Sequence, residues 1–265
     1  MAFETLEIEV RDGIGRVWLN RPAIRNAFNE TAIAELAQAF AAMGGDPAVR
    51  VVVLGGRGSA FSAGGDLNWM KKMAGFSFDE NYADALSLAG MLHTIATLPK
   101  PTIARVHGPA YAGGMGLVAA CDIAVAAEEA EFCLSEVKLG LVPATISPYV
   151  LAAMGKRAAH RYFLTAERFS AAEALRIGFV HALAPAAGID DAVARICGEL
   201  LSGGPAAHAA TKQLIRDVAG VPLSPELLAD TARHIATARA TEEGQEGVRA
   251  FLEKRRPAWL PGKQS

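Results

Sequence analysis

The sequence predicts an α/β protein. Residues 49–55 form a continuous apolar run with several β-branched side chains, which is typical of a buried parallel strand. A second strand is expected at residues 102–106, and a glycine-rich stretch follows each of these two strands. Beyond residue 189 only helical patterns remain. The expected order is therefore a strand hairpin, three strand–helix units and a helical tail.

The hairpin comes first along the chain. Residues 3–10 alternate apolar and polar side chains, as a half-buried strand does, and residues 16–20 read as its paired strand. An amphipathic helix is expected at residues 30–43, with Asn29 as its N-cap.

The middle of the chain is less regular. Residues 68–82 mix methionine, aromatic and charged side chains, and we expect a mobile, partly helical segment there. An apolar helix should follow at residues 83–97 and end before Pro99, which lacks the backbone N–H. Ser170 and Glu173 match a capping box. The other expected elements are a strand at 123–127, an extended segment at 179–182, and helices at 156–164, 171–177, 190–201, 205–219, 224–240 and 242–254.

Composition limits the class of protein. The chain has 265 residues, of which 51% are hydrophobic and 20% charged, so it can build a large core. The formal net charge of -2 gives no basic excess, and we expect no nucleic-acid partner. No apolar stretch reaches the roughly 18 residues that cross a bilayer. We read no secretion signal and expect no membrane association and a cytoplasmic location.

Cysteines and histidines predict no metal site. Cys121, Cys133 and Cys197 form no C-x-x-C pair, and we expect buried, reduced thiols. We expect two regions in the chain: residues 1–190 as the core with the active site, and residues 191–265 as a helical region. The helical region has more apolar faces than one sheet edge can cover, so we expect part of it to pack on another subunit.

Two glycine stretches point to a catalytic site. After the strand at 102–106 come Gly113, Gly114 and Gly116, and an apolar helical run opens at this turn. The stretch has neither the dinucleotide spacing nor the Gly-Lys-Ser/Thr of a P-loop. The second stretch, residues 61–67, reads FSAGGDL. Because two such turns can each offer one backbone N–H to a single oxygen atom, they predict an oxyanion hole assembled from two loops.

Glu136 is the candidate acid–base residue. It follows Phe132, Cys133 and Leu134, and apolar neighbours raise the pKa of a carboxyl group because burial disfavours its charged form. Such a group can move protons near neutral pH. The alternative is a surface glutamate at the start of a helix, where it would favour the helix dipole.

These residues are part of a pattern that resembles the crotonase, or enoyl-CoA hydratase/isomerase, superfamily. The motifs that carry the resemblance are LNRPAIRNAFN, FSAGGDL, KPTIARVHGPAYAGGMGL, CDIAVA, FCLSEVKLGLVP, LTAERFSAAEALRIGFV and FLEKRRPAW. The resemblance implies a spiral of ββα units with a C-terminal helical trimerisation region. FCLSEVKLGLVPATISPYV, LTAERF and EEGQEGVRAFLEKRRPAW are closest to bacterial 3-methylglutaconyl-CoA and isohexenylglutaconyl-CoA hydratases, the former an enzyme of leucine breakdown.

The resemblance also implies roles for residues. Gly65 and Gly113 supply the two oxyanion N–H groups, and Glu136 is the catalytic glutamate. Coenzyme A enters as part of the thioester substrate, with no permanently bound cofactor and no metal. The residues implied in binding it are Arg25, Ala63, Gly64, Asp66 and Leu67, together with Phe251 and Lys254 from a neighbouring subunit of a trimer or a dimer of trimers.

One position departs from the pattern. Well-known hydratases of this superfamily carry a first glutamate three residues after the oxyanion glycine, where this chain has Gly116. The resemblance still favours a hydratase, with Glu136 handling both proton transfers. A Δ3,Δ2-enoyl-CoA isomerase and a CoA-binding protein with weak catalysis remain alternatives. Lys71, Lys72 and Lys138 are equal candidates for holding a distal carboxylate of the acyl group.

Overall fold

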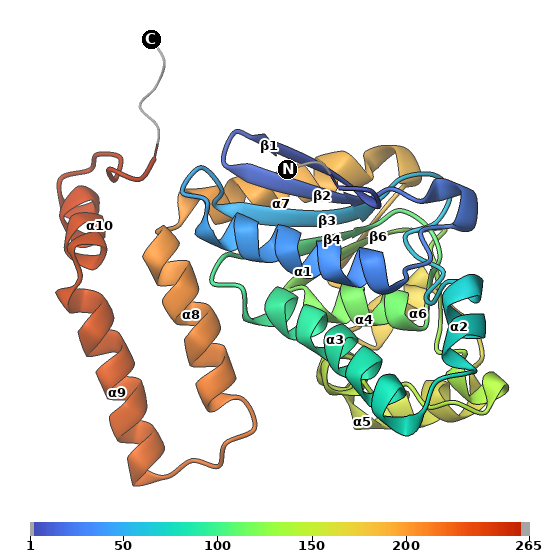
Figure 1. Ribbon diagram of the computed structural model, residues 1–265. Coiled ribbons are helices and arrows are strands. Elements are labelled where there is room, and N and C mark those ends of the chain that lie inside the picture. Colours follow the sequence, from blue (N-terminus) through green and yellow to red (C-terminus); the bar gives the residue numbers. More distant parts are fainter. Residues whose placement is uncertain (1–2, 261–265) are drawn as a thin grey trace.

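The computed structural model describes residues 3–260, and a six-stranded sheet forms its centre (Figure 1). The first two strands are an antiparallel hairpin, and every later neighbour pairs in parallel. In spatial order the strands are β1 (Leu6–Arg11), β2 (Ile14–Leu19), β3 (Val51–Gly56), β4 (Thr102–Val106), β6 (Ile123–Ala127) and β9 (Ala182–Ala184). The five strands predicted between residues 3 and 127 are thus confirmed, with bounds that differ by a few residues.

A second, small sheet was not predicted. It consists of β5 (Ala110–Tyr111), β7 (Glu131–Cys133) and β8 (Phe169–Ser170), with β5 parallel and β8 antiparallel to β7. The extended segment expected at 179–182 is also displaced, since β9 begins at residue 182. Phe179 is instead a buried core residue, with its ring edge-on to Phe132 at 5.3 Å between centroids.

Helices cover both faces of the large sheet. One face packs against α7 (Ile189–Ser202), where Ile189, Val193 and Cys197 meet Val51 and Val125. The other face lies towards α1 (Glu30–Gly45), α3 (Phe78–Thr97) and α4 (Gly113–Ala120) in the larger core cluster (Figure 1). The remaining helical elements are η1 (Pro22–Ile24), α2 (Leu67–Met73), η2 (Glu136–Leu139), α5 (Ser147–Thr165), α6 (Ala171–Arg176), η3 (Ala186–Gly188), α8 (Pro205–Val218), α9 (Pro225–Ala240) and α10 (Glu242–Leu252).

Capping explains where several helices begin. Asn29 caps α1 as expected, because its side chain accepts from the Ala32 N–H at 3.1 Å. The helix expected at 83–97 begins earlier, at residue 78. Its start is a full capping box in which Ser77 accepts from the Glu80 N–H and the Glu80 carboxylate accepts from the Ser77 N–H.

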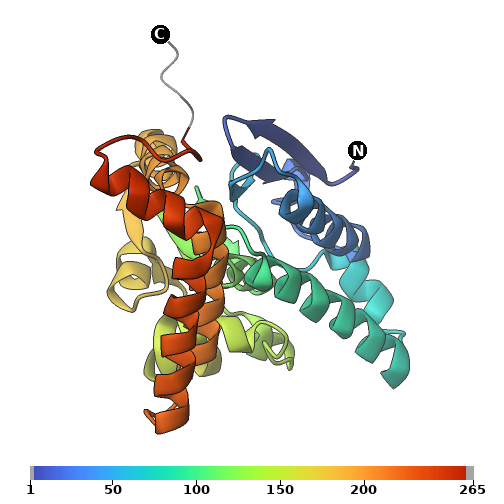
Figure 2. The same ribbon diagram turned by 90° about the vertical axis from the view of Figure 1, so that its left-hand side faces the viewer.

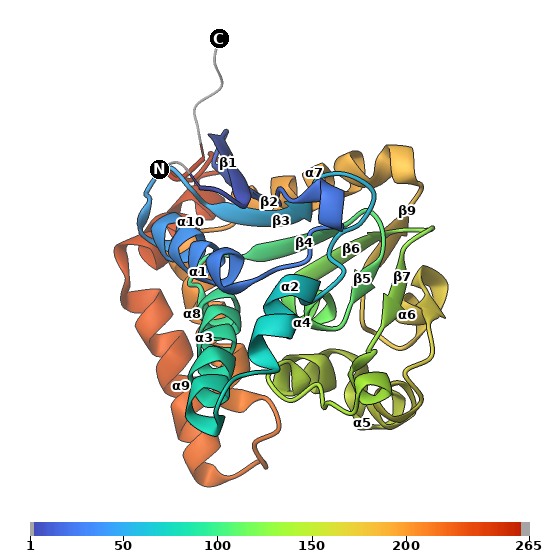
Figure 3. The same cartoon turned by 45° about the vertical axis from the view of Figure 1, so that its right-hand side comes forward.

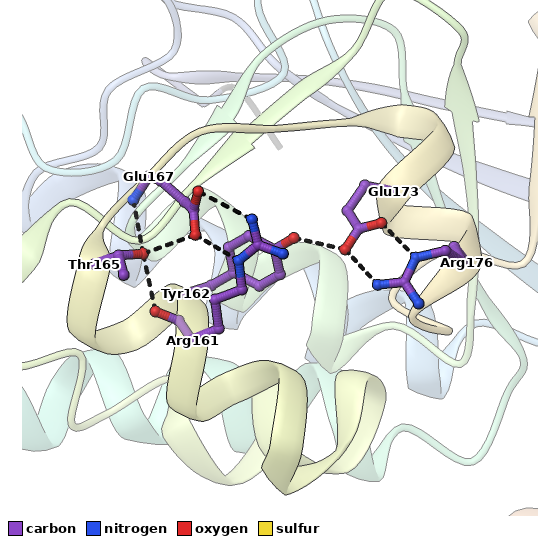
Figure 4. A network of polar contacts seen from close by, with 6 residues as sticks. All are labelled: Arg161, Tyr162, Thr165, Glu167, Glu173 and Arg176. Atoms are coloured by element: carbon purple, nitrogen blue, oxygen red, sulfur yellow. Dashed lines mark hydrogen bonds and ion pairs between the residues drawn. The ribbon is translucent and has the colours of Figure 1, made fainter.

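The capping box expected at Ser170 is only half formed. Its hydroxyl accepts from the Glu173 N–H at 3.3 Å, but the Glu173 carboxylate turns away to Tyr162 and Arg176 (Figure 4). These contacts join α5 to α6 and hold the pKa of Glu173 down to about 2, because Arg176 and Tyr162 donate to its charged form. The network continues through Arg161, Thr165 and Glu167.

The last three helices form an arm beside the core (Figures 1 and 2). In α9 no residue is buried, whereas α7 before the arm lies on the sheet. The expected boundary after residue 190 therefore falls in the first turn of a helix that belongs to the core packing. None of the helices among the described residues is long and apolar enough to cross a membrane.

One buried lysine anchors the arm. Lys212 of α8 is 9% exposed, and its amino group donates to the Asp122 carboxylate at 2.6 Å and to the Lys100 carbonyl at 3.0 Å. Asp122 also accepts from the backbone and the hydroxyl of Thr102 at the start of β4. The arm is thereby tied to the amino-terminal ends of β4 and β6. The glycine turns lie at the other, carboxyl-terminal end of the parallel strands.

Replacing this lysine should loosen the arm. We expect Lys212→Ala to lower the free energy of unfolding by about 2 kcal/mol, because it removes a largely buried ion pair and a hydrogen bond. Chemical denaturation measures the change. The matched control is Arg233→Ala, which removes an exposed pair with Asp230 at 3.8 Å and should cost at most about 0.5 kcal/mol. Equal losses would contradict the anchoring role.

Candidate functional site

The two glycine turns meet. Ser62 and Ala110 form a parallel bridge, and the Tyr111 N–H donates to the Ser62 carbonyl at 2.9 Å. A Cβ atom placed on Gly64 would lie 3.0 Å from the Cβ of Ala112, so the two backbones are in contact. Helices α2 and α4, which begin directly after the two turns, are both seen in Figure 3. The structure therefore brings together the two stretches that the sequence singled out.

Each turn presents one backbone N–H group. Gly113 is the first residue of α4, where helix geometry leaves the N–H without an acceptor. Among the described residues, neither the Gly113 nor the Gly65 N–H donates to a protein acceptor. The residue before each has a positive φ, 88° at Gly64 and 47° at Ala112. Because the backbone angles of that residue set the direction of the next N–H group, the positive φ in each turn determines where the donor points.

The backbone at Ala112 is unusual. A positive φ costs an alanine roughly 1–3 kcal/mol, since its Cβ crowds the backbone, and such residues concentrate at functional sites. Nothing in the sequence marks Ala112, because alanine carries no preference for this conformation. Reasoning from the residues alone therefore missed it, and only the backbone angles identify it.

Glycine is needed at these positions for different reasons. A Cβ on Gly113 would overlap the ring of Phe28, so the protein itself excludes a side chain there. A Cβ on Gly65 would lie 3.6 Å from the Trp69 ring, which is ordinary van der Waals contact. At Gly65 the fold therefore has room for a methyl group, which would instead obstruct a ligand that approaches the N–H.

The segment that carries Glu136 is hydrogen-bonded to the second glycine turn. Glu136 begins η2, three residues after Cys133, and the Cys133 carbonyl accepts from the Ala112 N–H at 2.8 Å. One carboxylate oxygen, Oε2, is buried and has no hydrogen-bond partner among the described residues. Burial raises the pKa of Glu136 above its ordinary value, as the sequence predicted. A buried carboxylate oxygen without a partner, on a segment hydrogen-bonded to the second glycine turn, is suited to a polar ligand.

Gly116 is closely packed. A Cβ at this position would overlap the side chain of Ile146, and Leu92 lies next to it at 3.7 Å. The place where a second carboxylate was sought is thus occupied by an aliphatic side chain from just before α5. Glu136 stands without a second carboxylate from this position.

The residues expected around coenzyme A fall into two groups. Arg25 and Ala63 lie together, because the Ala63 N–H donates to the Arg25 carbonyl at 2.9 Å. Asp66 caps α2 and pairs with Arg21 at 2.8 Å, so its carboxylate already serves the protein. Leu67 is 73% exposed beside them.

Phe251 and Lys254 lie elsewhere. Both belong to the end of the arm, across the molecule from α2 in Figure 1, and this chain does not bring them to the glycine turns. Two of the candidate lysines are also engaged. Lys72 pairs with Glu30 at 2.6 Å, and the Lys138 amino group donates to the Ala166 carbonyl at 2.7 Å.

No metal site emerges from the described part of the chain, where no three His, Cys, Asp or Glu residues gather in a way that could hold an ion. The three cysteines are buried and unpaired with one another, as predicted.

Comparisons with known proteins define the class. The chain matches the enoyl-CoA hydratase/isomerase family over residues 9–262. A solved enoyl-CoA hydratase from Shewanella pealeana is 43% identical with a TM-score of 0.95, covering 97% of this chain and 96% of that one. A Legionella pneumophila structure assigned as an enoyl-CoA hydratase/isomerase (crotonase) is 42% identical with a TM-score of 0.92, covering 98% and 100%. A Thermus thermophilus relative assigned as an enoyl-CoA hydratase is 39% identical over 252 residues, 94% of this chain and 99% of the relative.

The architecture is the α/β crotonase fold that the motifs implied. The chain belongs to the enoyl-CoA hydratase/isomerase family and is an enzyme of that family. The resemblance to the family is thereby confirmed. The closer likeness to glutaconyl-CoA hydratases remains a prediction.

Gly65 and Gly113 should respond differently to a methyl group. Gly113→Ala should lower the free energy of unfolding by about 1–3 kcal/mol, because the new Cβ overlaps Phe28. Gly65→Ala should change it by less than about 1 kcal/mol, since φ at Gly65 is not positive and the new Cβ makes only ordinary van der Waals contacts. Thermal and chemical unfolding compare the two variants. Similar losses in both would show that the packing around Gly113 is not what excludes a side chain.

Proposed function

We propose that the protein is an enoyl-CoA hydratase, a hydro-lyase that adds water across the double bond of an α,β-unsaturated acyl-CoA. In this proposal Gly65 and Gly113 donate to the thioester oxygen, and Glu136 moves the protons. The observation that carries it is the buried, unpartnered Oε2 of Glu136, three residues after Cys133, whose carbonyl accepts from the residue before Gly113. No metal and no permanently bound cofactor is needed, because coenzyme A is part of the substrate.

The reaction divides into two balanced steps. The Glu136 carboxylate takes a proton from water while the water oxygen bonds to the β carbon. The double-bond electrons move to the thioester oxygen, and the resulting enolate charge lies between the two N–H groups. The protonated Glu136 then returns its proton to the α carbon, which regenerates the carboxylate. Losing one oxyanion donor typically costs about 3 kcal/mol of barrier, so two fixed donors are a large part of such catalysis.

A single carboxylate is consistent with this scheme. Because the position of Gly116 is packed against Ile146, a second carboxyl group has no room there without repacking. The proton taken from water and the proton given to the α carbon then pass through the same side chain. This predicts addition of both to one face of the double bond.

A (methyl)glutaconyl-CoA type of substrate is the finer part of the proposal. It rests on the motif FCLSEVKLGLVPATISPYV, which places Glu136 and Ile146 in one stretch. Such a substrate would connect the enzyme to leucine breakdown. Lys71 is the one candidate lysine without a described partner, which favours it for the distal carboxylate. Arg25, Ala63 and Leu67 would meet the coenzyme A portion, with Gly64 and Asp66 shaping the turn beneath it.

A Δ3,Δ2-enoyl-CoA isomerase is the second candidate. The single carboxylate favours it, because moving one proton between two carbons needs only one acid–base group. Both reactions build negative charge on the thioester oxygen, as an enolate in hydration and as a dienolate in isomerisation, so two N–H donors serve either. The experiments below separate them by whether water is gained.

We also propose that the enzyme is a homo-oligomer, a trimer or a dimer of trimers, in which residues 191–265 contact neighbouring subunits. The arm carries exposed apolar side chains on α9 and α10, and α9 buries none of its residues within the chain. The exposed set includes Leu223, Leu228, Ile235, Val248, Phe251 and Leu252. Phe251 and Lys254 would then reach coenzyme A in a neighbouring site. Sedimentation velocity across a dilution series tests the assembly.

Removing the charge of Glu136 tests the reaction. Glu136→Gln keeps the size of the side chain and should lower kcat by about 10²–10⁴-fold, because it can neither take nor return a proton. Binding of the acyl-CoA should persist. Wild type and variant are incubated with 3-methylglutaconyl-CoA, crotonyl-CoA and a 3-enoyl-CoA, and products are followed by absorbance and mass.

Each outcome assigns a function. A gain of one water, fastest on 3-methylglutaconyl-CoA, supports the hydratase and its substrate. Migration of the double bond without added water identifies the isomerase. Full turnover by Glu136→Gln would remove Glu136 from the chemistry. Binding without turnover by the wild type would leave a CoA-binding protein.

The raised pKa of Glu136 has a consequence for stability. A carboxyl group whose pKa is raised on folding stabilises the native state while protonated, and that stability is lost as pH rises through the raised pKa. Glu136→Gln mimics the protonated form. Its Tm should therefore exceed that of the wild type at about pH 8, and the difference should shrink at about pH 4. Thermal unfolding at both pH values measures this. A difference that does not depend on pH would show that Glu136 is not desolvated.

A further inference from the structure

Ser62 contacts every segment that builds the oxyanion donors. Its hydroxyl donates to the Asn26 carbonyl at 2.9 Å and accepts from the Gly64 N–H at 3.2 Å. Its carbonyl accepts from the Tyr111 N–H at 2.9 Å. The side chain is fully buried, so no water competes for these bonds. One residue thus joins the loop before α1, the first glycine turn and the second glycine turn.

The packing around Ser62 is as close as its hydrogen bonding. A Cβ added to Gly114, in the first turn of α4, would lie 2.7 Å from the Ser62 carbonyl oxygen and 3.0 Å from its Cβ. The start of α4 therefore rests directly on Ser62. A larger side chain at position 62 would push α4, and with it the N–H of Gly113, away from the first turn.

The loop on the other side of Ser62 is itself fixed. Asn26 is 2% exposed, and its amide donates to the carbonyls of Arg57 and Ala60 at 2.8 Å each. Its side-chain oxygen accepts from the Arg21 N–H at 2.9 Å. Because Asn26 is held on all sides, its carbonyl is a rigid acceptor for the Ser62 hydroxyl.

We infer that Ser62 is a positioning residue that sets the distance and relative direction of the Gly65 and Gly113 N–H groups. Its hydroxyl orients the peptide one residue before the Gly64–Gly65 peptide, and its carbonyl holds the strand two residues before Gly113. Misplacing a reacting group by about 1 Å can cost about 10²-fold in rate. The inference rests on the proposed function for its catalytic consequence, whereas the placement of the two turns can be measured without activity.

The first measurement is local hydrogen exchange. In Ser62→Ala the Gly64 N–H and the Asn26 carbonyl lose their partner, so amides in residues 61–67 and 110–117 should exchange several-fold faster than in the wild type. The matched control is Thr102→Val, which removes another fully buried hydroxyl, bonded to Asp122 at 2.9 Å. Thr102 lies at the start of β4, away from the glycine turns, and its variant should leave both segments unchanged. Faster exchange in only one segment, or equally in both variants, would overturn the inference.

The second measurement is kinetic. With a thioester substrate that the wild type converts, Ser62→Ala should lower kcat at least about tenfold while KM changes by less than about threefold, because the donors act on the transition state. Thr102→Val should leave both constants unchanged. A larger effect on KM than on kcat would assign Ser62 to binding instead of positioning.

Ser62→Cys is made in parallel. A thiol is a weak donor at the same place, so this variant should fall between the wild type and Ser62→Ala in both measurements. If Ser62→Ala does not fold, Ser62→Cys takes its place in both comparisons with the wild type. A wild type that converts no acyl-CoA would overturn the proposed function, and the exchange comparison would then decide the placement alone.

Discussion

The contact between two glycine turns is the constraint on which the site depends. β3 and β4 are parallel neighbours, so the segments that leave their carboxyl ends emerge at the same edge of the sheet. The bridge between Ser62 and Ala110 keeps those segments together beyond the sheet. Everything the site offers, two N–H groups and the start of α4, is arranged around that bridge. The strand order therefore determines where the two N–H groups lie.

Burial has two opposite effects at Glu136. It removes water from the carboxyl group and raises its pKa, which would suit the proton transfers proposed for this group. The same burial disfavours the charged form and leaves Oε2 without a partner, which costs stability in the absence of a ligand. Ile146 fills the space beside Gly116. The strained backbone at Ala112 is a second local cost at the same site.

The sequence predicted the parts of the structure that depend on local pattern. The apolar run at β3, the cap at Asn29 and the glutamate among apolar neighbours are all visible in short stretches of residues. β5, β7 and β8 are two or three residues long, and such lengths carry no periodicity. Ile146 against Gly116 joins positions 30 residues apart, and the positive φ of Ala112 leaves no trace in composition. These features follow from tertiary packing between distant positions, which the local patterns in the sequence do not reveal.

Because the arm follows the sheet in the sequence, the ribosome also synthesises it after the sheet. The glycine turns, Glu136 and the sheet through β9 are complete by residue 184, whereas the exposed apolar side chains of the arm come after it. Because domains fold as they leave the ribosome, from the N-terminus onward, the core can fold before those side chains are translated. The exposed apolar side chains of the arm are therefore made after the sheet. Lys212 then joins the arm to Asp122, which directly precedes β6 in the sheet.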